Sequence, residues 1–398
     1  MVALSLSAFA AIGSGMVAPA LAGATIVREH RIHTEYAAAA SPAYSVLNDV
    51  SCPSLKFCLA VGFDVDSNEV THPLAEAWNG AAWSLASPPS PTAVHAPQLT
   101  SVACHSATDC IAIGSKNGNS APSFADSWDG SAWTETALWT GAYDSIRSIS
   151  CPSAFFCMAV GANDRYAGSR GTTWIWDGTG WRRSRPQSLR HLVLQSVSCP
   201  TIRSCYATAY ASGHYTDRIV QWNGRTWSIV NAGLPSHASL DGISCPRVRY
   251  CTSVGWIPAP NAEHPRALVV DRAGTSSWTH KLWAGSQGAN WALGPVSCSA
   301  PRQCTAVAVW TGGDGPKYYY ATSRGLSGGF IEPNRGHNPG FPVLSAISCR
   351  SLVCTAVGYG PVPDPRGGNV SPGPGTTLVI YRGMESALKS SAAASPSA

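Results

Sequence analysis

Fourteen cysteines are the residues of this chain whose type and spacing most plainly suggest chemistry. They form seven pairs, six with the spacing C-x5-C and the last with C-x4-C. Structural zinc sites use other spacings, and no His-x3-His partner accompanies these pairs. In an exported chain, regularly paired cysteines indicate disulfides. We therefore expect seven bonds, each within one pair: Cys52–Cys58, Cys104–Cys110, Cys151–Cys157, Cys199–Cys205, Cys245–Cys251, Cys298–Cys304 and Cys349–Cys354.

Export is predicted from the first residues. The run from Val2 to Ala22 carries no charge, and Ala18-Pro-Ala20-Leu-Ala22 offers small-residue cleavage sites, so residues 1–22 are interpreted as a signal peptide. A transmembrane anchor is the alternative, but the Ala-, Gly- and Ser-rich composition and the cleavage pattern favour the signal peptide. Residues 384–398 form a Ser- and Ala-rich tail that we expect to be disordered and that contains no apolar anchor. The sequence thus predicts a secreted, extracellular protein without a stable membrane anchor.

Other chemistry is thinly represented. The sequence contains no Gly-x-Ser-x-Gly elbow, His-Glu-x-x-His helix or phosphate-binding glycine loop. No spacing selects a pair of carboxylates for glycoside hydrolysis. The segment Asp64-Val-Asp66-Ser-Asn68-Glu69 resembles a calcium loop, but Glu69 stands where that loop needs glycine, which favours a solvated acidic loop. We expect no metal, no cofactor and no catalytic residue.

Charge argues against one class of partner. Charged residues make up only 12% of the chain, and the net charge of +5 is spread along it without a basic cluster. Such a chain is not expected to bind nucleic acid.

The cysteine pairs recur at a period that indicates a repeat architecture. The steps between successive first cysteines are 52, 47, 48, 46, 53 and 51 residues. A short segment rich in β-branched residues precedes each pair, with apolar residues five and two positions before the first cysteine, as at Leu47 and Val50. These two positions have opposite parity in a flat strand. The strand is therefore either buried on both faces or contains a bulge.

Three further strands complete each repeat. Cys58-Leu-Ala-Val-Gly62 and its equivalents are interpreted as a second strand that pairs with the first across a hairpin. Trp78-Asn79-Gly80-Ala-Ala-Trp83 and its equivalents predict a second hairpin, because both residues of Asn-Gly or Asp-Gly tolerate positive φ. We expect the flanking tryptophans in the core between sheets. Four antiparallel strands in each of seven repeats predict an all-β, seven-bladed β-propeller over residues 23–383, with one disulfide per blade. A β-solenoid is the alternative.

The last repeat lacks a fourth strand. Its third strand is the segment 376–382, and only Met384 and the tail follow it. The strand-like residues at about 25–32 precede the first repeat and have no partner there. We therefore predict that this N-terminal strand closes blade seven and removes an exposed sheet edge.

Loop lengths divide the expected disc into two faces. The C-x5-C and Asn-Gly turns are short and uniform, whereas the second turns and the crossovers between blades vary in length and composition. Variable loops on a rigid scaffold are where binding usually lies, although they can also be tolerated insertions. Aromatic and polar residues occur together there, as suits contact with carbohydrate or peptide. We predict ligand-binding roles for Tyr215, Asp217, Trp256, Trp310, Asp314, Tyr318 and Tyr359.

The repeat pattern V-S-C-P-x4-C-x-A-V-G, followed by W-[DN]-G-x-x-W, resembles the cysteine-stapled repeat proteins secreted by actinobacteria. More remotely it is similar to the Asp-box (BNR-repeat) propellers, which include sialidases and photosystem-assembly propellers and carry S-x-D-x-G-x-x-W-like turns. Ser127-Trp-Asp129-Gly130-Ser-Ala-Trp133 is one residue shorter between Asp and Gly. The sialidase motif of an aromatic residue, Arg, Ile and Pro is matched only by His30-Arg31-Ile32-His33, so no catalytic residue is carried over.

These observations predict a secreted, monomeric propeller that binds an extracellular glycan or protein without catalysis. The alternative is a sialidase-like or other polysaccharide-processing hydrolase or lyase, which requires converging carboxylates or arginines in an axial pocket.

Overall fold

The fold is described from a computed structural model of the whole chain. The described residues are 29–32, 42–91, 96–116, 123–136, 143–163, 169–211, 216–258, 265–275, 277–283, 291–312, 315–322, 343–351, 353–360 and 377–382. The predicted signal peptide and tail lie outside them. The described part of the chain contains no helix with the length and apolar character needed to span a bilayer.

The described residues form seven antiparallel sheets, which correspond to the seven sequence repeats. Blade 1 contains β2 (Pro42–Ser54), β3 (Phe57–Asp66), β4 (Thr71–Trp78) and β5 (Trp83–Leu85). Blade 2 contains β6 (Pro97–Ser106), β7 (Asp109–Lys116), β8 (Phe124–Trp128) and β9 (Trp133–Thr136). Blade 3 contains β10 (Asp144–Ser153), β11 (Phe156–Asn163), β12 (Arg170–Trp176) and β13 (Trp181–Ser184). A short 3-10 helix, η1 (Gln187–Leu189), lies in the crossover to blade 4.

Blades 4 to 7 continue the same order. Blade 4 contains β14 (Leu192–Thr201), β15 (Ser204–Ala211), β16 (Arg218–Trp222) and β17 (Trp227–Val230). Blade 5 contains β18 (Ser239–Arg247), β19 (Tyr250–Pro258), β20 (Pro265–Ala273) and β21 (Thr279–Trp283). Blade 6 contains β22 (Trp291–Ala300), β23 (Gln303–Gly312) and β24 (Gly315–Thr322). Blade 7 contains β25 (Val343–Arg350), β26 (Val353–Gly360), β27 (Thr377–Arg382) and the N-terminal strand β1 (Glu29–Ile32).

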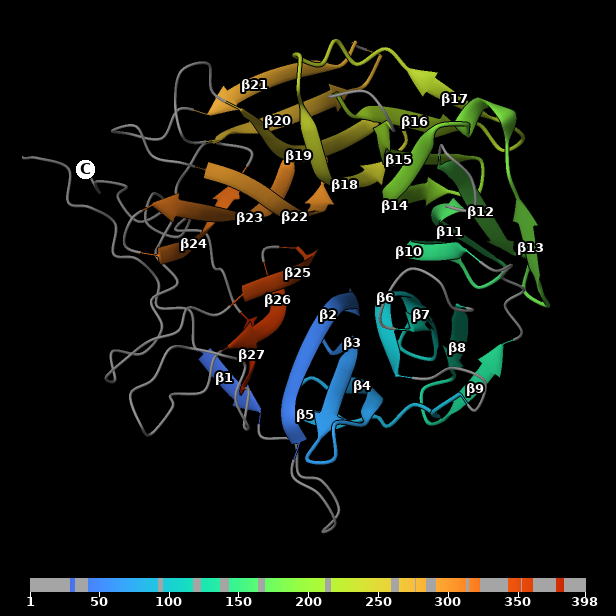
Figure 1. Cartoon of the computed structure of the whole chain (residues 1–398), viewed down its shortest axis with the longest axis vertical. Helices are drawn as coiled ribbons and strands as arrows, with labels where there is room; N and C mark the ends of the chain where they lie inside the picture. Colours follow the sequence, from blue (N-terminus) through green and yellow to red (C-terminus); the bar gives the residue numbers. More distant parts are fainter. Residues whose placement is uncertain are drawn as a thin grey trace, which may run out of the picture.

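The seven sheets stand around a common axis, so the predicted seven-bladed propeller is confirmed (Figure 1). The first strand of each repeat lies nearest the axis, and the fourth lies at the rim. The ring closes as predicted, because β1 pairs antiparallel with β27 and adds the outer strand of blade 7. Glu29 lies opposite Tyr381, and Ile32 lies opposite Leu378. Closure therefore joins the two ends of the propeller through backbone hydrogen bonds.

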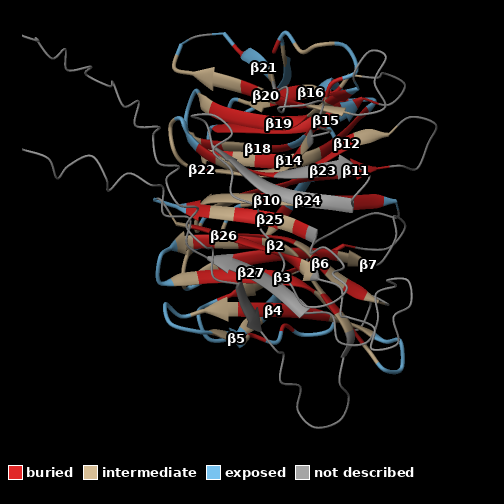
Figure 2. Cartoon of the chain, turned by 90° about the vertical axis from the view of Figure 1, so that its left-hand side faces the viewer, coloured by how far each residue is buried: buried red, intermediate tan, exposed pale blue. Residues whose placement is uncertain are grey.

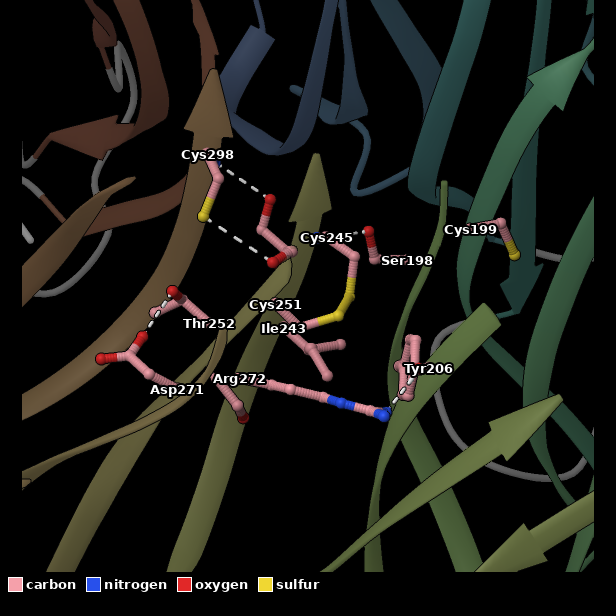
Figure 3. Close-up of a disulfide and its surroundings, with 12 residues drawn as sticks. Ser198, Cys199, Tyr206, Ile243, Cys245, Cys251, Thr252, Asp271, Arg272 and Cys298 are labelled. Carbon is pink, nitrogen blue, oxygen red and sulfur yellow. Dashed lines mark hydrogen bonds between the residues drawn. A yellow bond between two sulfur atoms is a disulfide. The ribbon is translucent and has the colours of Figure 1, made fainter. Parts of the chain in front are cut away.

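Each predicted disulfide forms within its own blade, and no described cysteine is free. In blade 2, for example, Cys104 and Cys110 are register partners on β6 and β7, so the bond is a cross-strand staple. Figure 3 shows the equivalent bond of blade 5, between Cys245 and Cys251. Fourteen paired cysteines are characteristic of an oxidising compartment.

A ring of serines joins neighbouring blades beside these disulfides. The serine just before the first cysteine of one blade accepts a hydrogen bond from the first-cysteine N–H of the next, as Ser198 does from Cys245 at 2.9 Å (Figure 3). Ser348 of blade 7 accepts from Cys52 of blade 1 at 3.0 Å, so the series crosses the closure. Ala103 stands at this position in blade 2 and offers no acceptor. The other four pairs are Ser51 to Cys104, Ser150 to Cys199, Ser244 to Cys298 and Ser297 to Cys349.

A β-bulge in every inner strand explains the parity of the apolar positions. In blade 1 the register between β2 and β3 shifts between Leu47 and Asp49, so Asn48 is the extra residue. Both Leu47 and Val50 are buried, because the shift turns the two side chains toward the core. Opposite the bulge, a Cβ on Gly62 would lie 1.8 Å from the carbonyl oxygen of Val46, so this position requires glycine. Of the two readings left open by the sequence, the bulge is the one observed.

The Trp-[Asp/Asn]-Gly turns form the predicted hairpins by a different mechanism from the one expected. In blade 2, Trp128 pairs with Trp133, and Gly130 alone adopts a positive φ, of 99°. Asp129 instead acts through its side chain, since Oδ1 accepts hydrogen bonds from the N–H groups of Ser131 at 2.8 Å and Ala132 at 2.7 Å. Trp128 is buried in the core between blades 1 and 2, as predicted for these tryptophans.

Candidate binding face

The strands run between two faces of the ring, as the edge-on view in Figure 2 shows. One face, called the turn face below, contains the turns between first and second strands and between third and fourth strands. The other, called the loop face, contains the turns between second and third strands and the crossovers between blades. Many loop-face segments, such as 212–215, 259–264 and 313–314, lie outside the described residues. The candidate site is therefore built from the described residues near this face.

The bulge leaves one residue of each first strand, the strand nearest the axis, out of the pairing with the second strand (Figure 1). The register shifts occur at the same place in each blade, four residues before the first cysteine. These residues are more exposed than the buried leucine or isoleucine that precedes each of them. We call them the axial ring: Asn48, Thr100, Arg147, Gln195, Asp241, Gly294 and Ser345.

The axial ring mixes side chains that serve the fold with side chains that face solvent. Asn48 Nδ2 donates to the carbonyl oxygen of Leu99 at 2.7 Å, so its amide joins blades 1 and 2. Thr100 Oγ1 donates to the carbonyl oxygen of Ile113 at 3.2 Å, within its own blade. Arg147 and Asp241 are exposed and carry opposite charges, two blades apart. The ring therefore carries a cation, an anion and several hydrogen-bonding groups on the inner strands.

Asp241 lies beside a second carboxylate, Asp217, which follows the loop between β15 and β16. Asp217 is only 4% exposed, and its Oδ2 accepts a hydrogen bond from the N–H of Leu240 at 2.8 Å. Burial raises the pKa of Asp217 to about 6, opposed by that hydrogen bond and by the charge of Arg218. The pKa of Asp241 is also raised to about 6. Protein atoms packed around its side chain reduce its hydration although part of it reaches solvent, and the negative charge of Asp217 is nearby.

The predicted residues Trp256 and Tyr359 occupy matching places in blades 5 and 7. Each lies five residues after the second cysteine of its blade, at the loop-face end of the second strand, and each is half-buried. Trp256 is the register partner of Ser239, two residues before Asp241. Phe63 and Tyr210 hold the same place in blades 1 and 4 and were not predicted. Counting five residues from each second cysteine would have found all four aromatic residues.

The remaining predicted residues are only partly covered by the structure. Tyr215 and Asp314 lie outside the described residues. Trp310 on β23 and Tyr318 on β24 have described backbones, in which Trp310 pairs with Lys317 and Tyr318 pairs with Val309 near the loop-face end of blade 6. The structure thus brings Asp217 close to Asp241, and places Trp256, Trp310, Tyr318 and Tyr359 at equivalent ends of blades 5, 6 and 7. Their ligand-binding roles stay predictions.

A buried ion-pair cluster fixes the loop face of blade 3. Asp144 Oδ2 accepts from Arg183 Nη1 at 2.6 Å, and Asp144 Oδ1 accepts from Arg185 Nη2 at 2.8 Å. Asn163 Nδ2 donates to Asp144 Oδ1 at 2.6 Å. The carboxylate is fully buried while both guanidinium side chains remain about one-third exposed. The buried Asp144 carboxylate therefore fixes the positions of the Arg183 and Arg185 guanidinium groups at the surface.

This arrangement suits recognition of a polar ligand more directly than metal chemistry. Among the described residues, no group of three His, Cys, Asp or Glu side chains could hold a metal ion. Asp217 and Asp241 are the carboxylate pair whose pKa values are raised near the axis, and Asp217 is engaged in holding the start of β18. Varied polar side chains on a rigid ring can orient a ligand without covalent change.

Comparisons with solved structures place the fold among the β-propellers. A structure described as YCF48 bound to D1 peptide aligns with a TM-score of 0.55 and 12% identity, over 89% of this chain and 94% of that one. YCF48 from Cyanidioschyzon merolae aligns with a TM-score of 0.52 and 13% identity, over 85% and 97%. The six-bladed fungal lectin of Aleuria aurantia aligns with a TM-score of 0.46 and 10% identity, over 74% and 100%. At such identities the likeness shows the fold alone. No protein-family model matches the sequence, and no curated protein sequence matches it.

Proposed function

We propose that this protein is a secreted, non-catalytic binding propeller that takes a glycan or protein ligand on its loop face. The observation that carries the proposal is the axial ring. One backbone position, repeated in seven blades by the same bulge, presents Asn, Thr, Arg, Gln, Asp, Gly and Ser. By contrast, the core positions five and two residues before each first cysteine hold only leucine, isoleucine or valine in all seven repeats. The fold needs the bulge but not this variety, which suits recognition of an asymmetric ligand.

Three further features support the proposal. Seven disulfides suit an extracellular, oxidising compartment and give the scaffold rigidity. Half-buried aromatic rings such as Trp256 at the loop-face ends of the second strands offer stacking surfaces near the polar ring. The structural neighbours with the higher TM-scores include YCF48 in complex with the D1 peptide. We propose that the chain acts as a monomer, since the ring is closed by its own N-terminal strand.

The proposal also extends to the turn between third and fourth strands. We infer that the Trp-[Asp/Asn]-Gly turn is a shortened relative of the Asp-box turn. It occupies the same place in the blade, and the Asp129 carboxylate accepts hydrogen bonds from successive turn N–H groups. The residue therefore has a structural role in the hairpin, on the face opposite the proposed binding surface.

The test is a combined glycan and peptide array probed with the wild-type chain and with an Arg147→Gln, Asp241→Asn double variant. We expect the variant to lose at least about tenfold in affinity for any ligand bound by the wild type, because charged hydrogen bonds to a ligand are removed. Arg203→Gln, an exposed change on the turn face, is the matched control and should bind normally. Equal loss in the control, or full retention in the axial variant, would contradict the proposal.

A glycoside-processing enzyme is the second candidate, favoured by the raised pKa values of Asp217 and Asp241. A panel of chromogenic glycosides tests it. Turnover that disappears in Asp241→Asn would establish the enzyme and defeat the binding-only proposal. Ligand capture on the array without turnover on any glycoside would support the binding propeller.

A further inference from the structure

The turn face carries exposed apolar side chains at the tips of the disulfide-stapled hairpins. Four of the eight large exposed apolar residues in the described chain are Leu55, Phe155, Ile202 and Val248. Each lies between the two cysteines of its blade, in blades 1, 3, 4 and 5. Phe155 is 76% exposed and Val248 is 43% exposed. Apolar side chains that recur at the hairpin tips of one face form a candidate contact surface.

Basic side chains surround these tips on one part of the turn face. Arginines are spread along the sequence, yet the fold gathers exposed ones into the first and third turns of blades 4 to 7, where Arg302 belongs to blade 6. Ile202 is followed by Arg203, and Val248 is flanked by Arg247 and Arg249. Lys56 follows Leu55 in the same way in blade 1. We define the basic arc as these residues together: Lys56, Ile202, Arg203, Arg225, Arg247, Val248, Arg249 and Arg350.

Acidic side chains on the turn face are concentrated in the other blades. Asp109 and Asp129 belong to blade 2, and Asp177 belongs to blade 3. Hydrogen bonds from the turn N–H groups hold the pKa of Asp129 below its usual range, and the Thr179 hydroxyl and N–H do the same for Asp177. On this face, the described turns of blades 4 to 7 and of blade 1 contain no acidic residue, and Asp271 near the end of β20 accepts a hydrogen bond from Thr252 at 2.6 Å through its Oδ1. The face is therefore divided into a basic part and an acidic part.

The tips of the basic arc are held rigidly. The Cys245–Cys251 bond closes the hairpin that carries Val248, and the Arg249 carbonyl oxygen accepts a hydrogen bond from the N–H of Gly274 in the neighbouring turn at 2.9 Å. In blade 4 the Cys199–Cys205 bond closes the hairpin that carries Ile202. Such tips lose little backbone freedom when they insert into another phase.

We propose that the basic arc docks the propeller onto an anionic lipid bilayer, with its apolar tips Ile202 and Val248 inserted among the headgroups. Cationic side chains beside inserted apolar ones are what peripheral attachment to an anionic bilayer requires. A protein partner usually needs one contiguous apolar centre. The apolar tips here belong to separate blades, and a fluid bilayer can accept each of them separately. The acidic side at blades 2 and 3 tilts the disc so that blades 4 and 5 lie closest to the lipid.

This attachment leaves the loop face directed away from the bilayer. It is independent of the ligand proposed for that face, because the two surfaces lie at opposite ends of the strands (Figure 2). A propeller docked in this way would display its variable loops to solutes or partners above the membrane.

The experiment is flotation of the full chain with vesicles of phosphatidylcholine alone and of phosphatidylcholine with phosphatidylserine. We expect binding to the phosphatidylserine vesicles and a marked loss at high salt, because exposed charge pairs are screened. Arg203→Gln with Arg249→Gln should weaken the partition coefficient by on the order of 25-fold, at about fivefold for each arginine. Val248→Asp should weaken it by at least about tenfold, since an apolar insertion is replaced by a charge.

Matched controls separate docking from general charge and folding effects. Val70→Asp changes a valine of similar exposure, 49%, on the loop face and should bind vesicles like the wild type. Arg190→Gln removes one positive charge from the exposed crossover to blade 4 and should lack the fivefold loss expected for each arginine of the arc. Thermal melts should be unchanged in all variants, because each replaced side chain is exposed. The proposal would be overturned by vesicle binding that does not depend on lipid charge, or by binding that falls equally in the controls. It would also be overturned if the protein bound polyglutamate but no vesicles, a result that would assign the arc to an acidic protein.

Discussion

Glu76 makes the stability of this propeller depend on pH in a direction opposite to that of most carboxylates. The residue lies on β4 of blade 1 opposite Ala60, which packs in the core between blades 7 and 1. Its side chain is 0% exposed, and neither carboxylate oxygen has a hydrogen-bond partner among the described residues. Burial raises the pKa of Glu76 from its ordinary 4.5 to about 7. The matching positions in blades 4 and 5 hold Val220 and Val270.

The sign and size of the effect follow from that pKa. The folded state holds the Glu76 proton more tightly than the unfolded state does, so the protein is most stable below about pH 4.5 with respect to this group. Stability then falls as pH rises from 4.5 through about 7, where the buried carboxyl must ionise. At about 1.4 kcal/mol per pH unit, the interval corresponds to roughly 3 kcal/mol of lost unfolding free energy at alkaline pH. Asp126, equally buried between blades 1 and 2, has its pKa raised to about 7 by burial and by Glu135 and adds a loss of the same sign.

The change Glu76→Val isolates the contribution of one residue. Valine has a similar volume and occupies this position in other blades, so the variant should fold with its disulfides intact. We expect it to be about 3 kcal/mol more stable than the wild type at about pH 8 and to show little advantage at about pH 5. Urea unfolding followed by tryptophan fluorescence at the two pH values measures both differences. The other raised carboxyls, Asp126 among them, titrate in both proteins and cancel in the comparison.

Glu69→Gln serves as the control, because Glu69 is an exposed residue of the β3–β4 turn. Its unfolding curve should follow that of the wild type at both pH values. The reasoning about Glu76 fails if the valine variant is no more stable near pH 8, or if its advantage is as large near pH 5. Either result would mean that the carboxyl finds water or a partner that stabilises its charge.

Four further changes test the scaffold. Ser198→Ala should lower the unfolding free energy by about 1 kcal/mol by removing an inter-blade acceptor, whereas Ala103→Ser should raise it by supplying the missing one, both read from urea midpoints. Replacing Cys52 and Cys58 together with serine should cost about 2 kcal/mol, the entropy of one small closed loop, and a loss near zero would show that the staple does not limit stability. Deleting β1 should expose the edge of β27 and produce dimers or larger species in light scattering, while a clean monomer would show that closure is dispensable.

The architecture could be predicted because its signals repeat. The cysteine spacing, the apolar segment before it and the Trp-[Asp/Asn]-Gly turn each recur through most or all of the chain, so chance agreement is small. The missing fourth strand of the last repeat pointed to the N-terminal strand, and β1 lies there. The serine of the V-S-C motif was visible too. Its role could not be read from one chain, because its partner, as for Ser198 and Cys245, lies in the next blade.

The candidate site was less predictable, because it depends on one exposed residue per repeat and the type of that residue does not recur from repeat to repeat. Arg147 and Asp241 lie at the bulge, and nothing in the sequence marks which of the residues before each cysteine is the extra one. Asp217 is predicted to bind a ligand as a polar loop residue near an aromatic one, and folding buries it against the start of β18. Loop residues such as Tyr215 depend on contacts that the repeat does not specify.

The bulge connects the parity of the core to the composition of the axial surface. Leu47 and Val50 can both face the core only if one residue between them is left out of the pairing, and that residue is then free of the packing pattern. Removing the bulge would therefore change the core and the axial ring together. Substituting the bulged residue alone leaves the apolar pattern intact. Within this one chain the bulged position is Asn48 in blade 1, Arg147 in blade 3 and Asp241 in blade 5. The architecture thus provides seven positions where side chains can vary for recognition at little cost in folding, and the same separation explains why their identities could not be deduced from the fold.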